Sequence, residues 1–320
     1  ISNYGELLFS NTTNYTIGLA DYNDKNPVSN GTSITLNKTQ LQENPVAIAK
    51  TFTEGNHKIG YLFYNQFAGS FDVELNAAFA YFKSENISDL IVDLRYNLGG
   101  STQSAGYLGA MITGQFTGEV FSKEVWNDKV LAAFSEDNFM NHFPDQILNK
   151  DENGNVILQE NINHLNLSQV CFIITDNTAS ASELVINSLS AYIDTKLVGT
   201  TSIGKQVGSV TLYDSENLLR TGDGLNTMHH YAMQPIVLEI QNKNGENNPN
   251  GYTAEIFIEE DYGNLGVLGE LSDPLLNRAM LYVTTGSKSS KRASNLSFDK
   301  VIHSKLLNPM GNNMYVEMKK

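Results

Sequence analysis

Cysteine, basic residues and long apolar runs are scarce in this sequence, and each shortage excludes a class of protein. The single cysteine, Cys171, excludes an intrachain disulfide and any thiolate-rich zinc or iron–sulfur site. With 21 Lys and Arg against 35 Asp and Glu, the formal net charge of −14 would repel phosphate backbones and anionic lipids. No stretch is apolar enough to span a bilayer, and the first residues lack the basic and apolar blocks of a signal peptide. We therefore expect no nucleic-acid partner and no integral membrane segment.

The composition is that of a folded, soluble protein. Hydrophobic residues make up 41% of the 320 residues and charged residues 18%, which is enough apolar material for a sizeable core. The length allows two domains, or one large domain with an appendage.

Strand and helix patterns alternate through the middle of the chain, which predicts an α/β core with βαβ units. The expected strands are 58–64, 88–95, 169–175 and 196–200. The expected helices are 72–84, 102–113 and one that begins near Ser180. Residues 114–168 give no clear pattern apart from a turn at 151–155.

Further elements are expected on both sides of this core. Residues 1–48 read as a short helix at 4–9, a strand at 14–22, a polar turn at 23–31 and a strand at 32–38. Beyond Lys205 the pattern predicts additional strands at 207–214, 231–241 and 252–260, and then a helix at 273–283 capped by Asp273. Residues 286–320 are rich in Lys and Ser and are expected to be a solvated extension.

Ser180 is the first candidate for chemistry. Small residues surround it at the point where a strand ends and an amphipathic helix begins. Free backbone N–H groups and the positive end of the helix dipole can stabilise an oxyanion at such a position. A serine hydroxyl needs a base within hydrogen-bond reach, and no Ser-His-Asp arrangement is visible nearby.

Lys205 is the candidate base. It lies in a Gly-Lys turn after the next strand, and parallel strands bring their carboxyl ends to the same edge of a sheet, so Lys205 can face Ser180. An unperturbed lysine, with a pKa of about 10.4, carries almost no free amine at neutral pH. We expect burial in an apolar cleft to lower this pKa, against the weaker opposing effect of the net charge.

The second group of candidate residues lies in a glycine loop. Gly99 and Gly100 follow the buried strand that ends in Asp93, Leu94 and Arg95. Glycines permit conformations closed to other residues and can expose N–H groups at the carboxyl edge of the sheet, where α/β sheets bind ligands. The amide of Gly99 or Gly100, together with that of Ala181, is the expected oxyanion hole.

Three motifs, DLRYNLGG, TASASE and TTSIGK in this order, resemble those of the carboxy-terminal processing peptidases, also called tail-specific proteases. This serine peptidase family has a crotonase-like α/β core, and the resemblance covers about residues 45–285. It implies that Ser180 is the nucleophile and Lys205 the general base of a Ser–Lys dyad. The implied activity is cleavage near the C-termini of proteins through an acyl-enzyme, without a cofactor.

The resemblance also implies an organisation and a location. Residues 1–48 resemble the back half of a peptide-binding PDZ module, residues 49–285 the peptidase core, and residues 286–320 an extension. The implied partners are protein or peptide substrates with apolar C-terminal tails, while homo-oligomer formation stays open. The family works in the bacterial cell envelope, which implies a periplasmic or lipid-anchored protein whose leader has been removed.

The sequence departs from the family pattern at two places. Many members carry a Gln four residues after the Lys, where it orients the amine; here Ser209 stands at that position, and Ser209 or Gln206 is the expected substitute. The Pro of the NPGG element is replaced by Leu98, a smaller change because the amides belong to the glycines.

Other polar residues have simpler interpretations. Glu183 is either a first-turn partner of the helix dipole or a functional carboxylate. Asp93 and Arg95 are expected to form a structural pair. His229 and His230 are predicted on a strand with their side chains on opposite faces, which argues against a metal site. Cys171 is expected in the core.

Two other functions remain open at this stage. The first is a non-catalytic module that binds apolar chains or peptides, since a retinoid-carrying protein has the same core. The second is a crotonase-type acyl-CoA enzyme, which shares the oxyanion geometry but needs no Ser–Lys pair. Loss of peptide turnover in both Ser180→Ala and Lys205→Ala would identify the peptidase.

Overall fold

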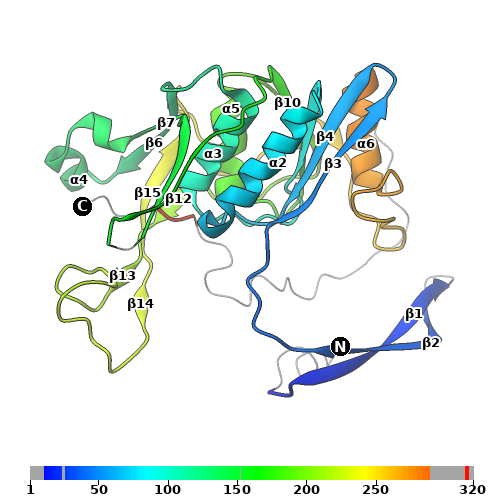
Figure 1. The fold of residues 1–320 in the computed structure, drawn as a ribbon, viewed down its shortest axis with the longest axis horizontal. Helices are drawn as coiled ribbons and strands as arrows, with labels where there is room; N and C mark the ends of the chain where they lie inside the picture. The colour runs from blue at the N-terminus through cyan, green and yellow to red at the C-terminus, as the bar shows by residue number, and fades with distance from the viewer. Residues whose placement is uncertain (1–10, 24–25, 152, 289–313, 317–320) are drawn as a thin grey trace.

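A six-stranded sheet forms the centre of the molecule (Figure 1). The computed structural model describes residues 11–23, 26–151, 153–288 and 314–316. The strand order is β16-β11-β10-β5-β4-β3; all neighbours are parallel except β3 and β4, which are antiparallel. The strands are β3 (Val46–Glu54), β4 (His57–Tyr64), β5 (Asp89–Asp93), β10 (Gln169–Ile174), β11 (Asp194–Gly199) and β16 (Ile256–Phe257).

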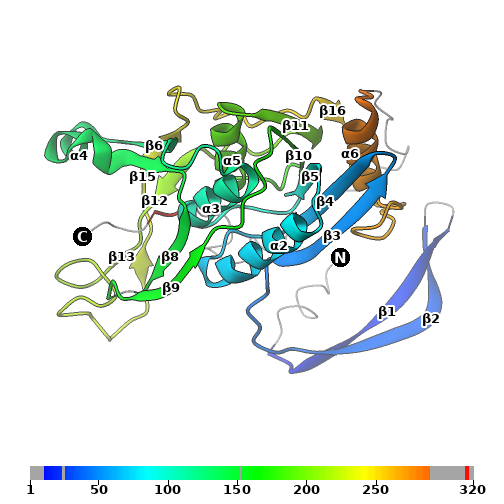
Figure 2. The ribbon, with the colours of Figure 1, turned by 45° about the horizontal axis from the view of Figure 1, so that its top comes forward.

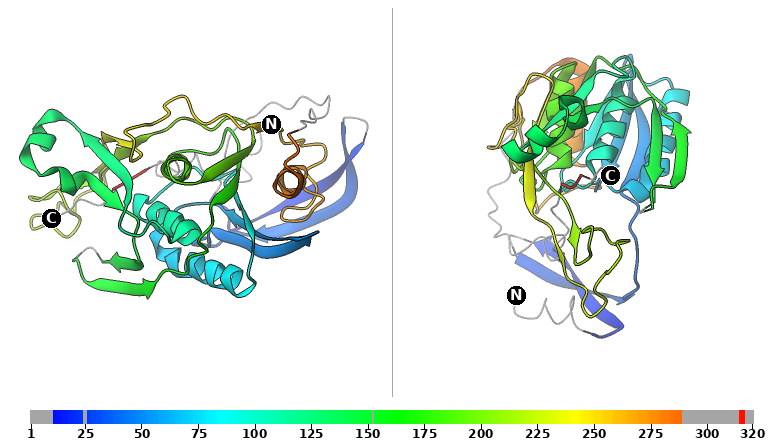
Figure 3. Two further views of the ribbon diagram at one scale, coloured as in Figure 1. Left: turned by 90° about the horizontal axis from the view of Figure 1, so that it is seen from above. Right: turned by 90° about the vertical axis from the view of Figure 1, so that its left-hand side faces the viewer.

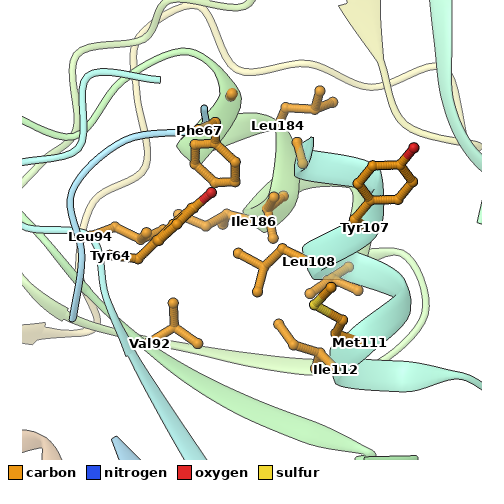
Figure 4. Close-up of a cluster of buried hydrophobic side chains, with 14 of the residues drawn as sticks. Tyr64, Phe67, Val92, Leu94, Tyr107, Leu108, Met111, Ile112, Leu184 and Ile186 are labelled. Carbon is orange, nitrogen blue, oxygen red and sulfur yellow. The ribbon is translucent and has the colours of Figure 1, made fainter. Parts of the chain in front are cut away.

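Helices cover both faces of this sheet, which fits the fully buried residues of β5. On one face lie α2 (Asp72–Ser84), α3 (Thr102–Thr113) and α5 (Ala181–Ser190); on the other lies α6 (Pro274–Thr285). Leu90 and Val92 of β5 pack in the cluster with α2, α3 and α5, part of which Figure 4 shows, whereas Ile91 packs with α6. The predicted α/β fold is confirmed, including the exact bounds of the helices at 72–84 and 102–113.

A second, antiparallel sheet lies beside the first and comes partly from the stretch that the sequence left unassigned. Its order is β12-β15-β6-β7, with β6 (Val120–Trp126), β7 (Met140–His142), β12 (Val207–Ser209) and β15 (Ile236–Gln241). Between β6 and β7 lie the short helices α4 (Asp128–Ala133) and η2 (Glu136–Phe139), and η1 (Gly69–Phe71) precedes α2.

The hairpin of β8 (Gln146–Lys150) and β9 (Val156–Asn161) contains the predicted turn at 151–155 (Figure 2). Asp151 organises this turn, because its Oδ1 accepts hydrogen bonds from the backbone N–H groups of Asn153 and Asn155.

The N-terminal strands form a separate two-stranded sheet. β1 (Asn14–Asn23) pairs with β2 (Asn26–Asn37), and the hairpin lies apart from the helical layers in Figure 1 and in the right-hand view of Figure 3. The turn predicted at 23–31 is wrong, because β2 already begins at Asn26 and pairs with β1 along its length. The helix expected at 4–9 lies outside the described residues. The PDZ-like interpretation stays a prediction, and β3 crosses its expected boundary at residue 48.

The strands predicted beyond Lys205 are mostly shorter than expected. The stretch 207–214 divides into β12 and β13 (Leu212–Tyr213), 231–241 into β14 (Ala232–Met233) and β15, and only β16 forms within 252–260. Asp273 caps α6 as predicted, since its carboxylate accepts from the N–H groups of Leu275 and Leu276. No helix in the described part of the chain is long and apolar enough to cross a membrane.

Residues 314–316 correct the expectation that the whole C-terminal extension is solvated. Met314 is fully buried and Val316 is 8% exposed. Tyr315 forms parallel β-bridges with Ser101 on one side and Ser209 on the other. This short segment, red in Figure 3, therefore joins the loop before α3 to the second sheet.

Candidate functional site

Ser180 lies on a strained turn between β10 and α5. Its φ of 65° and ψ of −119° fall in a region that non-glycine residues rarely adopt. Surrounding bonds hold this conformation, because the Ala179 N–H donates to the Asn97 carbonyl and the Ser180 N–H donates to Glu183. The Ser180 side chain is buried, and its Oγ makes no hydrogen bond with any described residue.

The carboxylate of Glu183 connects two segments through hydrogen bonds: the loop that contains Lys205 and the start of α5. One carboxylate oxygen accepts from the backbone N–H groups of Ser180 at 2.9 Å and Lys205 at 2.8 Å. The other accepts from the Gly204 N–H at 2.6 Å and the Ser202 hydroxyl at 2.5 Å. The predicted proximity of the two segments is therefore confirmed at the backbone. Glu183 was expected to be either a partner of the helix dipole or a functional carboxylate. The structure shows that it does more than interact with the dipole, because its carboxylate holds both segments in place.

Lys205 lies half-buried beside this carboxylate. Burial lowers the pKa of Lys205 from its ordinary value, while the negative charge of Glu183 raises it by a smaller amount. The direction is the one expected from the sequence. A lowered pKa increases the fraction of neutral amine that can accept a proton.

The glycine loop lies directly against Ser180. Gly99 has φ +104°, and a Cβ added to it would lie 2.5 Å from the Ser180 Cβ and 2.9 Å from the Ala181 nitrogen. Gly100 has φ +137°, and a Cβ there would lie 2.0 Å from the carbonyl oxygen of Phe67. Both positions therefore require glycine. The structure brings together Ser180, Ala181 and the two glycines, as the sequence predicted.

Asn97 organises this loop and was not singled out from the sequence. Its side chain accepts from the Gly99 N–H at 2.9 Å and donates to the Tyr64 carbonyl at 2.9 Å. Its own carbonyl accepts from the Ala179 N–H and the Ser182 hydroxyl. An Asn two residues before a glycine, just after a strand, is a typical Asx-turn former, and this signal could have identified it. The Gly99 N–H is consequently occupied, whereas the Gly100 N–H has no recorded acceptor among the described residues.

Ser209 and Gln206 differ in their contacts. The Ser209 hydroxyl donates to the carbonyl of Met314 at 2.9 Å. The Gln206 side chain is buried, and its amide makes no hydrogen bond with the described residues. The orientation of the Lys205 amine by either residue stays a prediction.

Asp93 and Arg95 form the expected structural pair. Arg95 Nη2 lies 2.6 Å from Asp93 Oδ2 and 2.8 Å from Asp273 Oδ2, and the Tyr61 hydroxyl donates to Asp93 at 2.9 Å. All four side chains are buried. Because Asp273 caps α6, this network fixes the end of β5 to the helix on the other face of the sheet.

The remaining candidates lie away from these motifs in the sequence. His229 and His230 lie in a loop before β14, so the predicted strand is wrong there; His229 Nε2 is 3.1 Å from Asp214 Oδ2. In the described ranges, no group of three or more His, Cys, Asp or Glu side chains could hold a metal ion. Cys171 is buried in β10, where burial raises the pKa of its thiol, as expected of a core residue.

Comparisons with known proteins agree with this α/β fold. A family model described as "Peptidase family S41" matches residues 58–243. The chain belongs to peptidase family S41, a family of serine-type peptidases, and the resemblance seen in the sequence is confirmed. A search of curated proteins found no match.

One of the solved structures that match this chain shares its fold with a TM-score well above one half. A protein from Bacteroides fragilis, assigned to the S41 proteases, superposes with a TM-score of 0.70 at 22% identity, covering 89% of this chain and 70% of that one. The photosystem II D1 C-terminal processing protease has a TM-score of 0.47 at 14% identity, covering 71% of this chain and 52% of that one. A peptidase structure from Parabacteroides merdae has a TM-score of 0.43 at 14% identity, with 73% and 66% covered. The chain thus spans about half to two thirds of the lengths of the last two.

Proposed function

We propose that this protein is a serine endopeptidase in which Ser180 is the nucleophile and Lys205 the general base. The observation that carries the proposal is the shared carboxylate: one oxygen of Glu183 accepts from the backbone N–H groups of both residues. The buried, unpartnered Ser180 hydroxyl and the lowered pKa of Lys205 support the same roles. Membership of a serine-type peptidase family supports the reaction class.

In the proposed reaction, Ser180 Oγ attacks the scissile carbonyl carbon while its proton moves to the neutral amine of Lys205. The Ala181 N–H, at the first residue of α5, and the Gly100 N–H stabilise the oxyanion; Gly99 is the weaker candidate because Asn97 occupies its N–H. Lys205 then returns the proton to the departing amine, which leaves an acyl-enzyme. Lys205 then takes a proton from water, which attacks the acyl carbon; the bond to Ser180 Oγ breaks, the acid leaves, and Lys205 returns the proton to Ser180 Oγ.

The finer specificity follows from the family resemblance. We propose that the substrates are proteins or peptides cut near apolar C-terminal tails, that no cofactor takes part, and that the protein works in the bacterial cell envelope. The motifs DLRYNLGG, TASASE and TTSIGK support this assignment.

A fluorophosphonate probe tests the nucleophile. Because it phosphonylates activated serines, we expect labelling at Ser180, identified by mass spectrometry of the tryptic peptide, and none in Ser180→Ala. Ser182→Ala is the matched control, since the Ser182 hydroxyl donates to the Asn97 carbonyl and has no proposed part in the chemistry. Equal labelling of Ser180→Ala and the wild type would exclude Ser180 as the nucleophile. An unlabelled wild type that still binds peptides would instead favour the non-catalytic binding module.

The pH profile tests the base. Lys205 acts when it is neutral, so kcat/KM should rise with pH and level off above the pKa of Lys205. Because burial lowers this pKa, the midpoint of the rise should lie below the ordinary lysine value of about 10.4. Initial rates on a fluorogenic peptide from pH 5 to about 11 measure the profile. A rate that is constant over this range would argue against a lysine base.

A further inference from the structure

The segment Met314–Val316 occupies a slot between two backbone edges. On one side, the Tyr315 N–H donates to the Gly100 carbonyl at 3.3 Å, and Thr102 donates to the Tyr315 carbonyl through its N–H and its hydroxyl. On the other side, the Ser209 N–H and hydroxyl donate to the Met314 carbonyl, each at 2.9 Å, and the Val316 N–H donates to the Ser209 carbonyl at 3.1 Å. The segment is therefore bound as an added β-strand, parallel to both edges.

Both edges of the slot adjoin the motifs of the candidate site in the sequence. Gly100 follows Gly99, which lies against Ser180, and Ser209 lies four residues after Lys205. A peptide strand in this slot is consequently held by residues that closely follow, in the sequence, the glycine loop and the proposed base.

The slot recognises mainly the backbone of the segment, and the segment's side chains add selectivity. All of these hydrogen bonds are made to backbone atoms of the segment. Any extended peptide has these backbone groups, unless proline stands at a position whose N–H must donate. Met314 and Val316 are buried within the main apolar cluster, whereas Tyr315 is only partly buried. Alternation along a strand sends the first two side chains to one face, so that face favours large apolar residues at every second position.

Space for a longer peptide adjoins the slot. A cavity of about 610 Å³ is bordered by Tyr315 and Val316, the start of α3, and residues of β6, β7 and β8. Its walls combine apolar groups such as Phe121 with charged ones such as Lys150.

We propose that this slot is a binding site for an extended peptide with apolar side chains and that Met314–Val316 is its resident occupant. The chain's own segment is the occupant to which the observations point, since it is bound there through both edges and buries Met314 completely. A tethered segment competes at an effective concentration on the order of millimolar, so an external peptide must displace it. The consequence for turnover rests on the proposed peptidase function, but the binding does not.

Binding is measured first, in a Ser180→Ala background that prevents cleavage. The probe is a fluorescein-labelled peptide with the sequence of residues 311–318. Met314→Asp places a charge in a fully buried position and should release the segment, so we expect the peptide to bind at least about tenfold more tightly than to the parent. Met228→Asp is the matched control, since Met228 is 90% exposed, and it should bind as the parent does. Equal affinity in Met314→Asp and the parent would overturn the proposal.

Hydrogen exchange in the unsubstituted segment gives a second test that does not depend on how Met314→Asp folds. The Val316 amide donates to the Ser209 carbonyl and should exchange slowly. Saturating peptide should speed its exchange by at least about tenfold in the Ser180→Ala protein. Unchanged exchange with peptide bound would show that the peptide binds elsewhere and would refute the proposal.

Turnover then separates this proposal from the proposed function. With Ser180 restored, Met314→Asp should lower KM for a fluorogenic peptide about tenfold with kcat unchanged, because the segment competes with substrate. If Ser180 is not the nucleophile of a peptidase, no turnover is seen in either protein, while both binding results still hold. If turnover is normal but neither binding result appears, the peptidase stands and the resident occupant is refuted.

Discussion

Replacing Lys205 by arginine is expected to abolish peptide turnover as completely as replacing it by alanine. A guanidinium has a pKa above 12 and keeps its proton at any working pH, so it cannot accept one from Ser180. It preserves the positive charge and much of the length, which makes it a test of proton transfer alone. We expect kcat/KM to fall by a factor on the order of 10³ or more in both variants, the range seen when a base is lost from a nucleophile–base pair.

The control for this prediction is Lys196→Arg. Lys196 forms an ion pair with Asp194, whose side chain is exposed while that of Lys196 is partly exposed, so the substitution should leave kcat/KM within about twofold of wild type. Initial rates with a fluorogenic peptide, together with thermal unfolding of every variant, measure the effect. A folded Lys205→Arg protein that kept more than about a tenth of the wild-type rate would exclude Lys205 as the base.

The helices and strands that the sequence predicted correctly are those specified by residues within or next to the element itself. The helix at 102–113 follows from its small and apolar residues after a Gly-Gly turn, and the start of α6 follows from Asp273 and the proline behind it. β5 was recognisable because five consecutive buried residues leave a nearly continuous apolar run. Each of these signals lies within about ten residues of the element that it predicts.

The parts that escaped prediction depend on contacts distant in sequence. Met314–Val316 contains two residues that favour strands, but three residues are too few to predict one, and the partners lie more than 100 residues earlier, at Ser209 and Ser101. The motifs pointed to Ser180 and Lys205 as the proposed nucleophile and base, but they did not reveal which residue connects the two segments. Glu183 acquires that role only when the 202–205 loop folds back on it. The choice between Gly99 and Gly100 likewise needed the Asn97 side chain in three dimensions.

Glu183→Gln is expected to weaken both the fold and the reaction. The carboxylate accepts four hydrogen bonds, two at each oxygen, and an amide replaces one of those oxygens by a donor. Two buried donors then lose their acceptor, at about 1–3 kcal/mol each, so the free energy of unfolding should fall by roughly 2–6 kcal/mol. Release of the 202–205 loop also displaces Lys205 from Ser180, and a displacement of about 1 Å can reduce kcat by a factor on the order of 10².

The pH profile distinguishes this positioning role from a general loss of stability. The negative charge of Glu183 raises the pKa of Lys205, so its removal should lower that pKa and move the rising limb of the pH–rate profile to lower pH. Urea unfolding measures the free energy of unfolding, and kcat measured as a function of pH locates the rising limb. Glu270→Gln is the control, because Glu270 forms an exposed ion pair with Lys50 and should change neither quantity appreciably. A Glu183→Gln protein with wild-type kcat and an unmoved limb would show that Ser180 and Lys205 do not depend on this carboxylate.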